Sequence, residues 1–172
     1  VLQGRIDNPL DDVGKQQAAE IARILPSADV VISSPLSRAL QTAAYLSDSV
    51  EIDERWIELD YGEWDGLAVG DLPPHTWERW QADLDLRPPG GETIPEVGTR
   101  VHDALEELAG SNPPRHTVIV SHVSPIKAAV AWVLGVGDEI SWRTRLGNAS
   151  YTQIEVSKAR RALVSFNVTA AG

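Results

Sequence analysis

His122 is the residue whose type and position in the sequence most clearly suggest chemistry. It follows the apolar run 118–120, whose β-branched residues predict a buried strand. Ser124-Pro125 comes next and is typical of a helix N-cap followed by the first helical position. Although an isolated histidine is more often a core residue, this one is expected at the carboxyl end of a strand, beside a helix N-terminus. Ligands bind there in open α/β sheets, and free helix N–H groups suit an anion.

Arg38 follows the same pattern earlier in the chain. The apolar run 30–33 leads into Ser34-Pro35, and Arg38 is expected in the first turn of the helix that follows. A guanidinium in this place can bind phosphate through two parallel hydrogen bonds, whereas many arginines on helices are solvated surface residues. The two segments together predict one shared anion site.

The segment 56–66 supplies candidates for a proton donor. It mixes acids, aromatic residues and glycines, and we expect it to form an ordered loop. A carboxyl group partly buried against an aromatic ring has a raised pKa and can donate a proton, whereas the alternative is a solvated acidic loop. The sequence of this segment does not show which carboxyl group is the proton donor: Glu58, Asp60, Glu63 or Asp65.

Composition restricts the function. A net charge of −10 argues against a general nucleic-acid or membrane surface, and the absence of cysteine excludes disulfides, thiolate nucleophiles and cysteine metal sites. The sequence contains no phosphate-binding or dinucleotide glycine motif, no GxSxG and no HExxH. No apolar run approaches the ~18–20 residues that span a bilayer. We therefore expect a cytoplasmic enzyme without metal or cofactor, which binds neither nucleic acid nor membrane.

The remaining pattern predicts one α/β domain. Helices that alternate with short apolar strands imply a mostly parallel sheet, and 172 residues suit a single domain. The tryptophans of the middle region are expected mostly in the core rather than in a lid: Trp56, Trp64, Trp77 and Trp80. Helices are expected at about 11–25, 35–46, 73–86 and 94–108 and from Ser124 onward, strands at 30–33, 50–52 and 118–120, and a closing β-hairpin at 151–156 and 162–168.

Five motifs occur in order along nearly the whole chain: LQGRIDNPLDDVG (2–14), SSPLSRALQTA (33–43), ELDYGEWDG (58–66), PPGGET (88–93) and VSHVSPIKA (120–128). Each is weak alone, but their order and spacing together resemble the histidine phosphatase superfamily, also called phosphoglycerate mutase-like. The resemblance implies a three-layer α/β/α sandwich around a mostly parallel central sheet.

The resemblance also implies roles for individual residues. Arg38 resembles the second phosphate-binding arginine of the family, and His122 resembles the second histidine of the pocket. Glu58 resembles the acid that protonates the leaving oxygen, with Glu63 as the alternative. Gln3 and Gly4 match positions beside the substrate. In such enzymes, another histidine accepts the phosphoryl group as a phosphohistidine, and water then releases phosphate without a metal or cofactor.

Two departures from the family pattern matter. Val123 stands where the family often has glycine, so backbone access to the phosphate should be tighter there. The sequence also has no Arg-His-Gly, the motif that carries the nucleophile on the family's first strand, upstream of segment 2–14. We therefore expect the single domain 1–172 to be missing its first strand and nucleophile at the N-terminus. That strand is expected to be central in the sheet.

The resemblance implies that the intact protein is a phosphomonoester hydrolase, a histidine acid phosphatase-like enzyme acting through a phosphohistidine. The short connection between segments 58–66 and 88–93 favours phosphatases over mutases. Phosphoglycerate mutase-type transfer is the first alternative, and a catalytically inactive phosphate-ligand binding or interaction protein is the second. The expected partner is a small phosphorylated substrate. The sequence does not decide whether the protein also forms a homodimer.

Overall fold

The computed structural model describes residues 1–110, 116–157 and 160–170. Its strands form a parallel sheet in the order β2-β1-β3 and a separate antiparallel pair, β4-β5. The predicted hairpin is therefore confirmed, while residues 158–159 of its expected turn lie outside the described residues. The strands are β1 (Val30–Ser33), β2 (Glu51–Ile52), β3 (Thr117–Val120), β4 (Ser150–Val156) and β5 (Arg161–Thr169).

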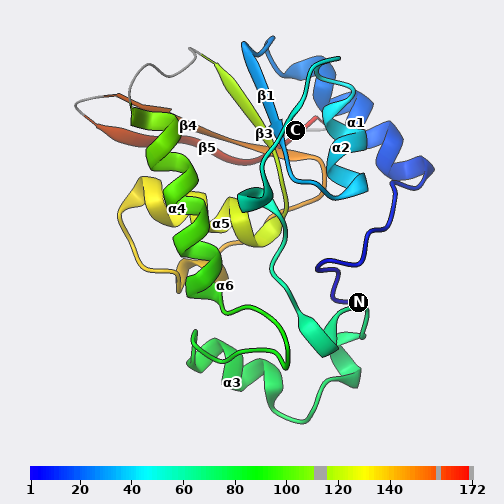
Figure 1. Ribbon diagram of the computed structural model, residues 1–172, viewed down its shortest axis with the longest axis vertical. Coiled ribbons are helices and arrows are strands. Elements are labelled where there is room, and N and C mark those ends of the chain that lie inside the picture. The colour runs from blue at the N-terminus through cyan, green and yellow to red at the C-terminus, as the bar shows by residue number, and fades with distance from the viewer. Residues whose placement is uncertain (111–115, 158–159, 171–172) are drawn as a thin grey trace.

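Helices cover both sides of the parallel sheet. Figure 1 shows α1 and α2 on one side of β1 and β3, with α4 and α5 on the other. These three layers confirm the predicted α/β/α sandwich with a parallel central sheet. The helices are α1 (Asp12–Ile24), α2 (Ser37–Ala43), α3 (Thr76–Ala82), α4 (Ile94–Gly110), α5 (Val123–Leu134) and α6 (Ile140–Arg143), and the 3₁₀ turns are η1 (Glu54–Trp56), η2 (Gly62–Trp64) and η3 (Val69–Asp71).

The register of the central strand brings the two predicted segments together. β1 pairs with β3 from Val30 opposite Thr117 to Ser33 opposite Val120. The backbone N–H of Ser34 then donates to the carbonyl of Val120 at 2.9 Å, so both chains leave the sheet at the same edge. The connections into α2 and α5 therefore begin side by side.

The Ser-Pro pattern located both helices but predicted their first residues wrongly. α2 begins at Ser37, two residues after Pro35, and α5 begins at Val123, with His122 as its N-cap residue. Pro125 is consequently the third residue of α5. The first four N–H groups of a helix lack intrahelical partners, so proline costs no hydrogen bond anywhere in that turn. A Ser-Pro pair thus fixes a helix start only to within one turn.

The core cluster joins the parallel sheet to α4 and α5 and extends to α3. Trp56 and Trp80 are each only 2% exposed there, and Trp64 and Trp77 pack against this core. The expectation that these tryptophans are mainly core residues is confirmed. Among the described residues, no helix is both long enough and apolar enough to cross a membrane.

Candidate functional site

The carboxyl ends of β1 and β3 hold a buried serine hydroxyl beside a half-buried histidine ring. His122 Nε2 lies 2.7 Å from the hydroxyl oxygen of Ser34, which is completely buried. Ser34 Oγ also accepts a weak hydrogen bond from the N–H of Leu36 at 3.3 Å. The serine of the first Ser-Pro pair therefore orients the histidine of the second segment rather than capping α2. Sequence reasoning missed this role.

Arg38 projects from the first turn of α2, as predicted, and is half-buried beside the N-terminal segment. Its Nη2 donates to the carbonyl of Gly4 at 2.7 Å, and its Nη1 donates to the carbonyl of Ile6 at 3.0 Å. Burial lowers the pKa of Arg38, while nearby Glu58 and Asp7 counteract that shift. The guanidinium thus remains a cation held in one orientation by backbone carbonyls.

Asp65 fixes the segment that holds Arg38. Its carboxylate accepts three consecutive backbone N–H groups, from Gly4 at 2.7 Å, Arg5 at 2.7 Å and Ile6 at 2.9 Å. The carbonyls that contact Arg38 belong to the same turn, so Asp65 positions the arginine indirectly. One of the four candidate proton donors therefore has a structural function, which its place in the acidic segment did not reveal.

We expect Asp65→Asn to weaken inorganic phosphate binding and to lower the free energy of unfolding by about 1–3 kcal/mol, because an amide cannot accept all three N–H groups with full charge. Isothermal titration calorimetry and urea unfolding measure the two effects. Asp71→Asn serves as the matched control, since Asp71 is an exposed acid in η3. An Asp65 variant with unchanged phosphate affinity would contradict the positioning role.

Glu58 is a buried carboxyl group beside the N-terminus of α5. It is 4% exposed, and its Oε1 accepts the N–H of Leu59 at 2.7 Å and of Ser124 at 3.2 Å. Burial raises the pKa of Glu58 above the usual glutamate value, although these hydrogen bonds and Arg38 oppose the shift. Glu63, by contrast, is exposed in η2. The environment of a proton donor therefore occurs at Glu58 rather than at Glu63.

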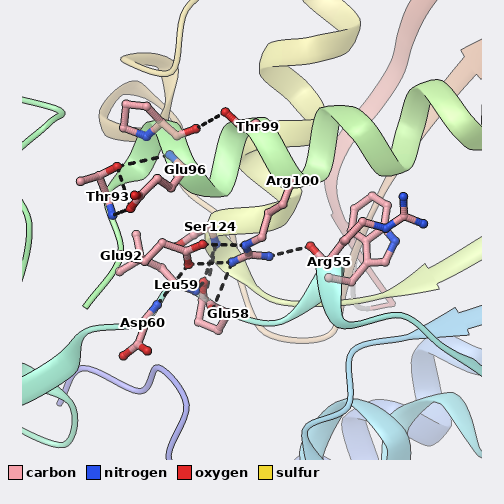
Figure 2. A network of polar contacts seen from close by, with 12 residues as sticks. Arg55, Glu58, Leu59, Asp60, Glu92, Thr93, Glu96, Thr99, Arg100 and Ser124 are labelled. Atoms are coloured by element: carbon pink, nitrogen blue, oxygen red, sulfur yellow. Dashed lines mark hydrogen bonds and ion pairs between the residues drawn. The ribbon is translucent and has the colours of Figure 1, made fainter. Parts of the chain in front are cut away.

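Arg100 holds the backbone around Glu58, as Figure 2 shows. Its Nε and Nη2 donate to the carboxylate of Glu92 at 2.9 and 3.0 Å, and its Nη1 donates to the carbonyl of Arg55 at 2.6 Å. Nη2 also reaches the carbonyl of Glu58 at 3.4 Å. Glu92 is the acid of the PPGGET motif, so that motif anchors the acidic segment through an arginine of α4. No local pattern in the sequence indicates these contacts of Arg100 and Glu92.

His122 has no charge at neutral pH in this environment. Burial, followed by the positive charges of Arg38 and Arg100, lowers the pKa of His122 to about 3. A neutral imidazole can donate one hydrogen bond and accept another, and its tautomer follows from its partners. A phosphate dianion beside Arg38 would offset the positive charges and favour a proton on His122. The arrangement can therefore bind an anion and stabilise additional negative charge.

The other predicted substrate contacts surround this group. Gly4 is buried, and a Cβ atom there would lie 2.7 Å from both the carbonyl oxygen of Leu59 and the ring of Tyr61. Glycine is therefore required by close packing. Gln3 is exposed on the adjoining surface, and Val123, the first residue of α5, is 41% exposed. Gln3 precedes Gly4 and Val123 follows His122 in the chain, and the substrate contacts of both residues stay predictions.

The remaining histidines have other surroundings. His75 precedes α3 with a φ of 62°, His102 contacts the carbonyl of Ala128, and His116 contacts the carbonyl of Ser27. Within the described part of the chain, no group of three or more histidine, aspartate or glutamate side chains is arranged to hold a metal ion.

Comparisons with known proteins match this geometry to one family. Residues 1–169 match the histidine phosphatase superfamily (branch 1). Phosphoserine phosphatase 1 of Hydrogenobacter thermophilus is 32% identical, over 97% of this chain and 84% of its own length. Glucosyl-3-phosphoglycerate phosphatase of Mycolicibacterium vanbaalenii is 34% identical, over 89% of this chain and 76% of its own.

A solved structure leads to the same conclusion. The native structure of a mycobacterial glucosyl-3-phosphoglycerate phosphatase superposes with a TM-score of 0.88 at 29% identity. The match covers 98% of this chain and 92% of that one, so it includes both layers of helices and the sheet. The chain therefore belongs to the histidine phosphatase superfamily, with the phosphoglycerate mutase-like fold that its sequence motifs predicted.

Proposed function

We propose that this protein is a phosphomonoester hydrolase whose phosphate site lies between Arg38 and His122 at the N-terminus of α5. The observation that supports it most strongly is the meeting of these two residues with the buried acid Glu58 at one edge of the sheet. A guanidinium and an imidazole beside the positive end of a helix dipole together suit a phosphate dianion. The names of its relatives favour hydrolysis over mutase-type transfer.

Each residue has a defined part in the proposed reaction. Arg38 and His122 hold the phosphoryl oxygens and stabilise the charge that develops on them during transfer. Glu58 protonates the leaving oxygen, because its raised pKa keeps a proton available nearer neutral pH than an ordinary glutamate does. The same carboxylate, once deprotonated, activates the water that releases phosphate. Gln3, Gly4 and Val123 border the substrate.

We also propose that the phosphoryl acceptor is a histidine on a strand that lies outside residues 1–172. β3 pairs with β1 along one edge, and no described strand pairs with its other edge. Its four residues are only half-buried although three of them are apolar, whereas β1 has three buried residues. A further strand running parallel to β3 on that edge would pair its open backbone groups and would end beside His122, at the carboxyl edge of the sheet.

Two of the relatives are named for small phosphorylated substrates, phosphoserine and glucosyl-3-phosphoglycerate. In both, phosphate is esterified to an alcohol oxygen that must take a proton when it leaves. A small phosphorylated alcohol is therefore the substrate class we propose for this chain.

The function is tested by measuring phosphate release from a panel of phosphomonoesters. We expect turnover that vanadate inhibits, without interconversion of 2- and 3-phosphoglycerate, from a longer chain that carries an upstream Arg-His-Gly. The chain Val1–Gly172 should bind phosphate without turning over. Its intact mass and N-terminal sequence must be verified first. Persistent turnover by this form would refute the proposed nucleophile, and an inactive longer chain that still binds phosphate would indicate a binding protein.

A further inference from the structure

A cavity of about 300 Å³ lies beside the candidate site and is lined by residues of α3, α4, α5 and α6 and of the segment before η2. This volume is at the lower end of the range for small-molecule pockets, which is ~300–1,000 Å³. The lining residues include Tyr61, Trp77, Trp80, Trp142, Ser124 and Lys127. Arg38, Glu58 and His122 are not among the residues that line it.

The cavity is continuous with the proposed reaction site through the first turn of α5. Ser124 lines the cavity, and its backbone N–H lies 3.2 Å from Oε1 of Glu58, the proposed proton donor. Val123 also lines the cavity and directly follows His122. An ester whose phosphate contacts His122 and whose leaving oxygen faces Glu58 would therefore have its alcohol portion next to the cavity.

Three indole rings form a stiff apolar wall. Trp77 and Trp142 meet edge to face at 5.3 Å, Trp80 and Trp142 at 5.7 Å, and Trp77 and Trp80 at 6.0 Å. Such edge-to-face packing fixes each ring against the others, and Trp77 and Trp142 are the partly exposed members of the group. The indole N–H groups of Trp80 and Trp142 are buried without a hydrogen-bond partner among the described residues.

Lys127 is the cation of this cavity. Its Nζ donates to the carbonyl of Ser141 at 2.7 Å, and a lysine ammonium has two further N–H groups to offer a ligand. Among the described residues, those that line the cavity include Lys127 as the one cation and no carboxylate. The lining therefore favours an oxygen acceptor, neutral or anionic, and disfavours an ammonium group.

We propose that this cavity binds the leaving alcohol and selects phosphomonoesters whose alcohol carries a flat ring with an oxygen acceptor, in preference to small zwitterionic esters such as phosphoserine. The inference rests on the proposed function, because the phosphate contacts orient the ester toward the cavity. Trp77 and Trp142 contact the ring, and Lys127 contacts the acceptor. All three are then specificity-determining residues rather than catalytic ones.

Non-hydrolysable phosphonates test this selection without requiring turnover. Methylphosphonate, 2-aminoethylphosphonate, benzylphosphonate and 4-carboxybenzylphosphonate are titrated into the chain Val1–Gly172, with calorimetry and tryptophan fluorescence as readouts. We expect benzylphosphonate to bind at least about tenfold more tightly than methylphosphonate, because its ring is removed from water against the indole wall. The carboxylated ligand should bind most tightly and the aminoethyl ligand most weakly.

Substitutions then assign the preference to the cavity. Trp142→Ala should lower benzylphosphonate affinity while methylphosphonate affinity stays the same, and Trp77→Leu provides the same test if the first variant unfolds. Lys127→Met should abolish the advantage of the carboxylated ligand over benzylphosphonate, and Lys127→Arg should restore it. Equal affinities for benzyl- and methylphosphonate would overturn the proposed role of the cavity and leave the proposed phosphate site intact. Failure of every phosphonate, inorganic phosphate and vanadate to bind would instead refute the proposed phosphate site.

Discussion

Arg38→Ala is expected to weaken inorganic phosphate and vanadate binding by about a hundredfold or more. Arg38 supplies charge-assisted hydrogen bonds, each of which contributes ~1.5–3 kcal/mol, and every 1.4 kcal/mol is tenfold in affinity. Calorimetric titration of the wild-type and variant chains with both anions measures the loss. Arg38→Lys should recover only part of the affinity, since an ammonium cannot form the two parallel bonds of a guanidinium.

The control for this variant must separate lost charge from lost structure. Arg38 also binds the carbonyls of Gly4 and Ile6, so its removal loosens the N-terminal segment. Urea unfolding shows whether the variant remains folded, and Arg23→Ala removes an exposed arginine of α1 as a matched change in net charge. If the Arg38→Ala chain is folded and binds phosphate as tightly as wild type, Arg38 is not part of the phosphate site.

Glu58→Gln is expected to slow hydrolysis of alkyl phosphates by about 10²–10⁴-fold, the usual contribution of a general acid. Hydrolysis of 4-nitrophenyl phosphate should slow far less, because its leaving group needs little protonation. The measurement is kcat/KM for both ester types in the catalytically complete chain. Glu63→Gln should leave both rates near wild type. An equal loss on both esters in the Glu58 variant would indicate Glu63 as the acid or a structural role for Glu58.

Burial of Glu58 also predicts two effects of pH. Turnover of alkyl phosphates should fall as pH rises through the raised pKa of Glu58, because the proton to be donated is then lost. Over the same interval, between the ordinary glutamate pKa and the raised one, the folded protein binds a proton that the unfolded chain has released. The free energy of unfolding therefore falls as pH rises there.

Glu58→Gln should remove that dependence on pH and be more stable than wild type at neutral pH, with no difference at acid pH. Urea unfolding at several pH values measures this effect. A wild-type stability that is constant across the interval would contradict the assigned environment of Glu58.

Local patterns in the sequence predicted the strands and the two connections that carry Arg38 and His122. Short β-branched runs have few alternatives once turn residues bound them, and parallel pairing brings their carboxyl ends to one edge. The helix starts were less accurate, because proline is accepted throughout a first turn. The choice of Glu58 over Glu63 depended on the family resemblance until the structure showed which of the two is buried.

Contacts that join distant segments could not be predicted in this way. Asp65 contacts residues about sixty positions earlier, and Arg100 reaches the carbonyls of Arg55 and Glu58 from another helix. Such pairs have no periodic spacing, so composition and local patterns contain no signal for them. Trp142 was missed for the same reason, since only the packing of α6 places it on the wall of the cavity.

The pairing of β1 with β3 has a consequence for how the protein acquires its activity. Val30 and Thr117 are neighbours in the sheet but are separated by 87 positions in the chain. Contacts of such high sequence separation form late in folding, because closing the intervening loop costs chain entropy before the contact stabilises anything. Arg38 and His122 approach each other only when this pair forms. A partly folded chain therefore contains no phosphate site, and recovery of anion binding during refolding should coincide with the final, cooperative phase.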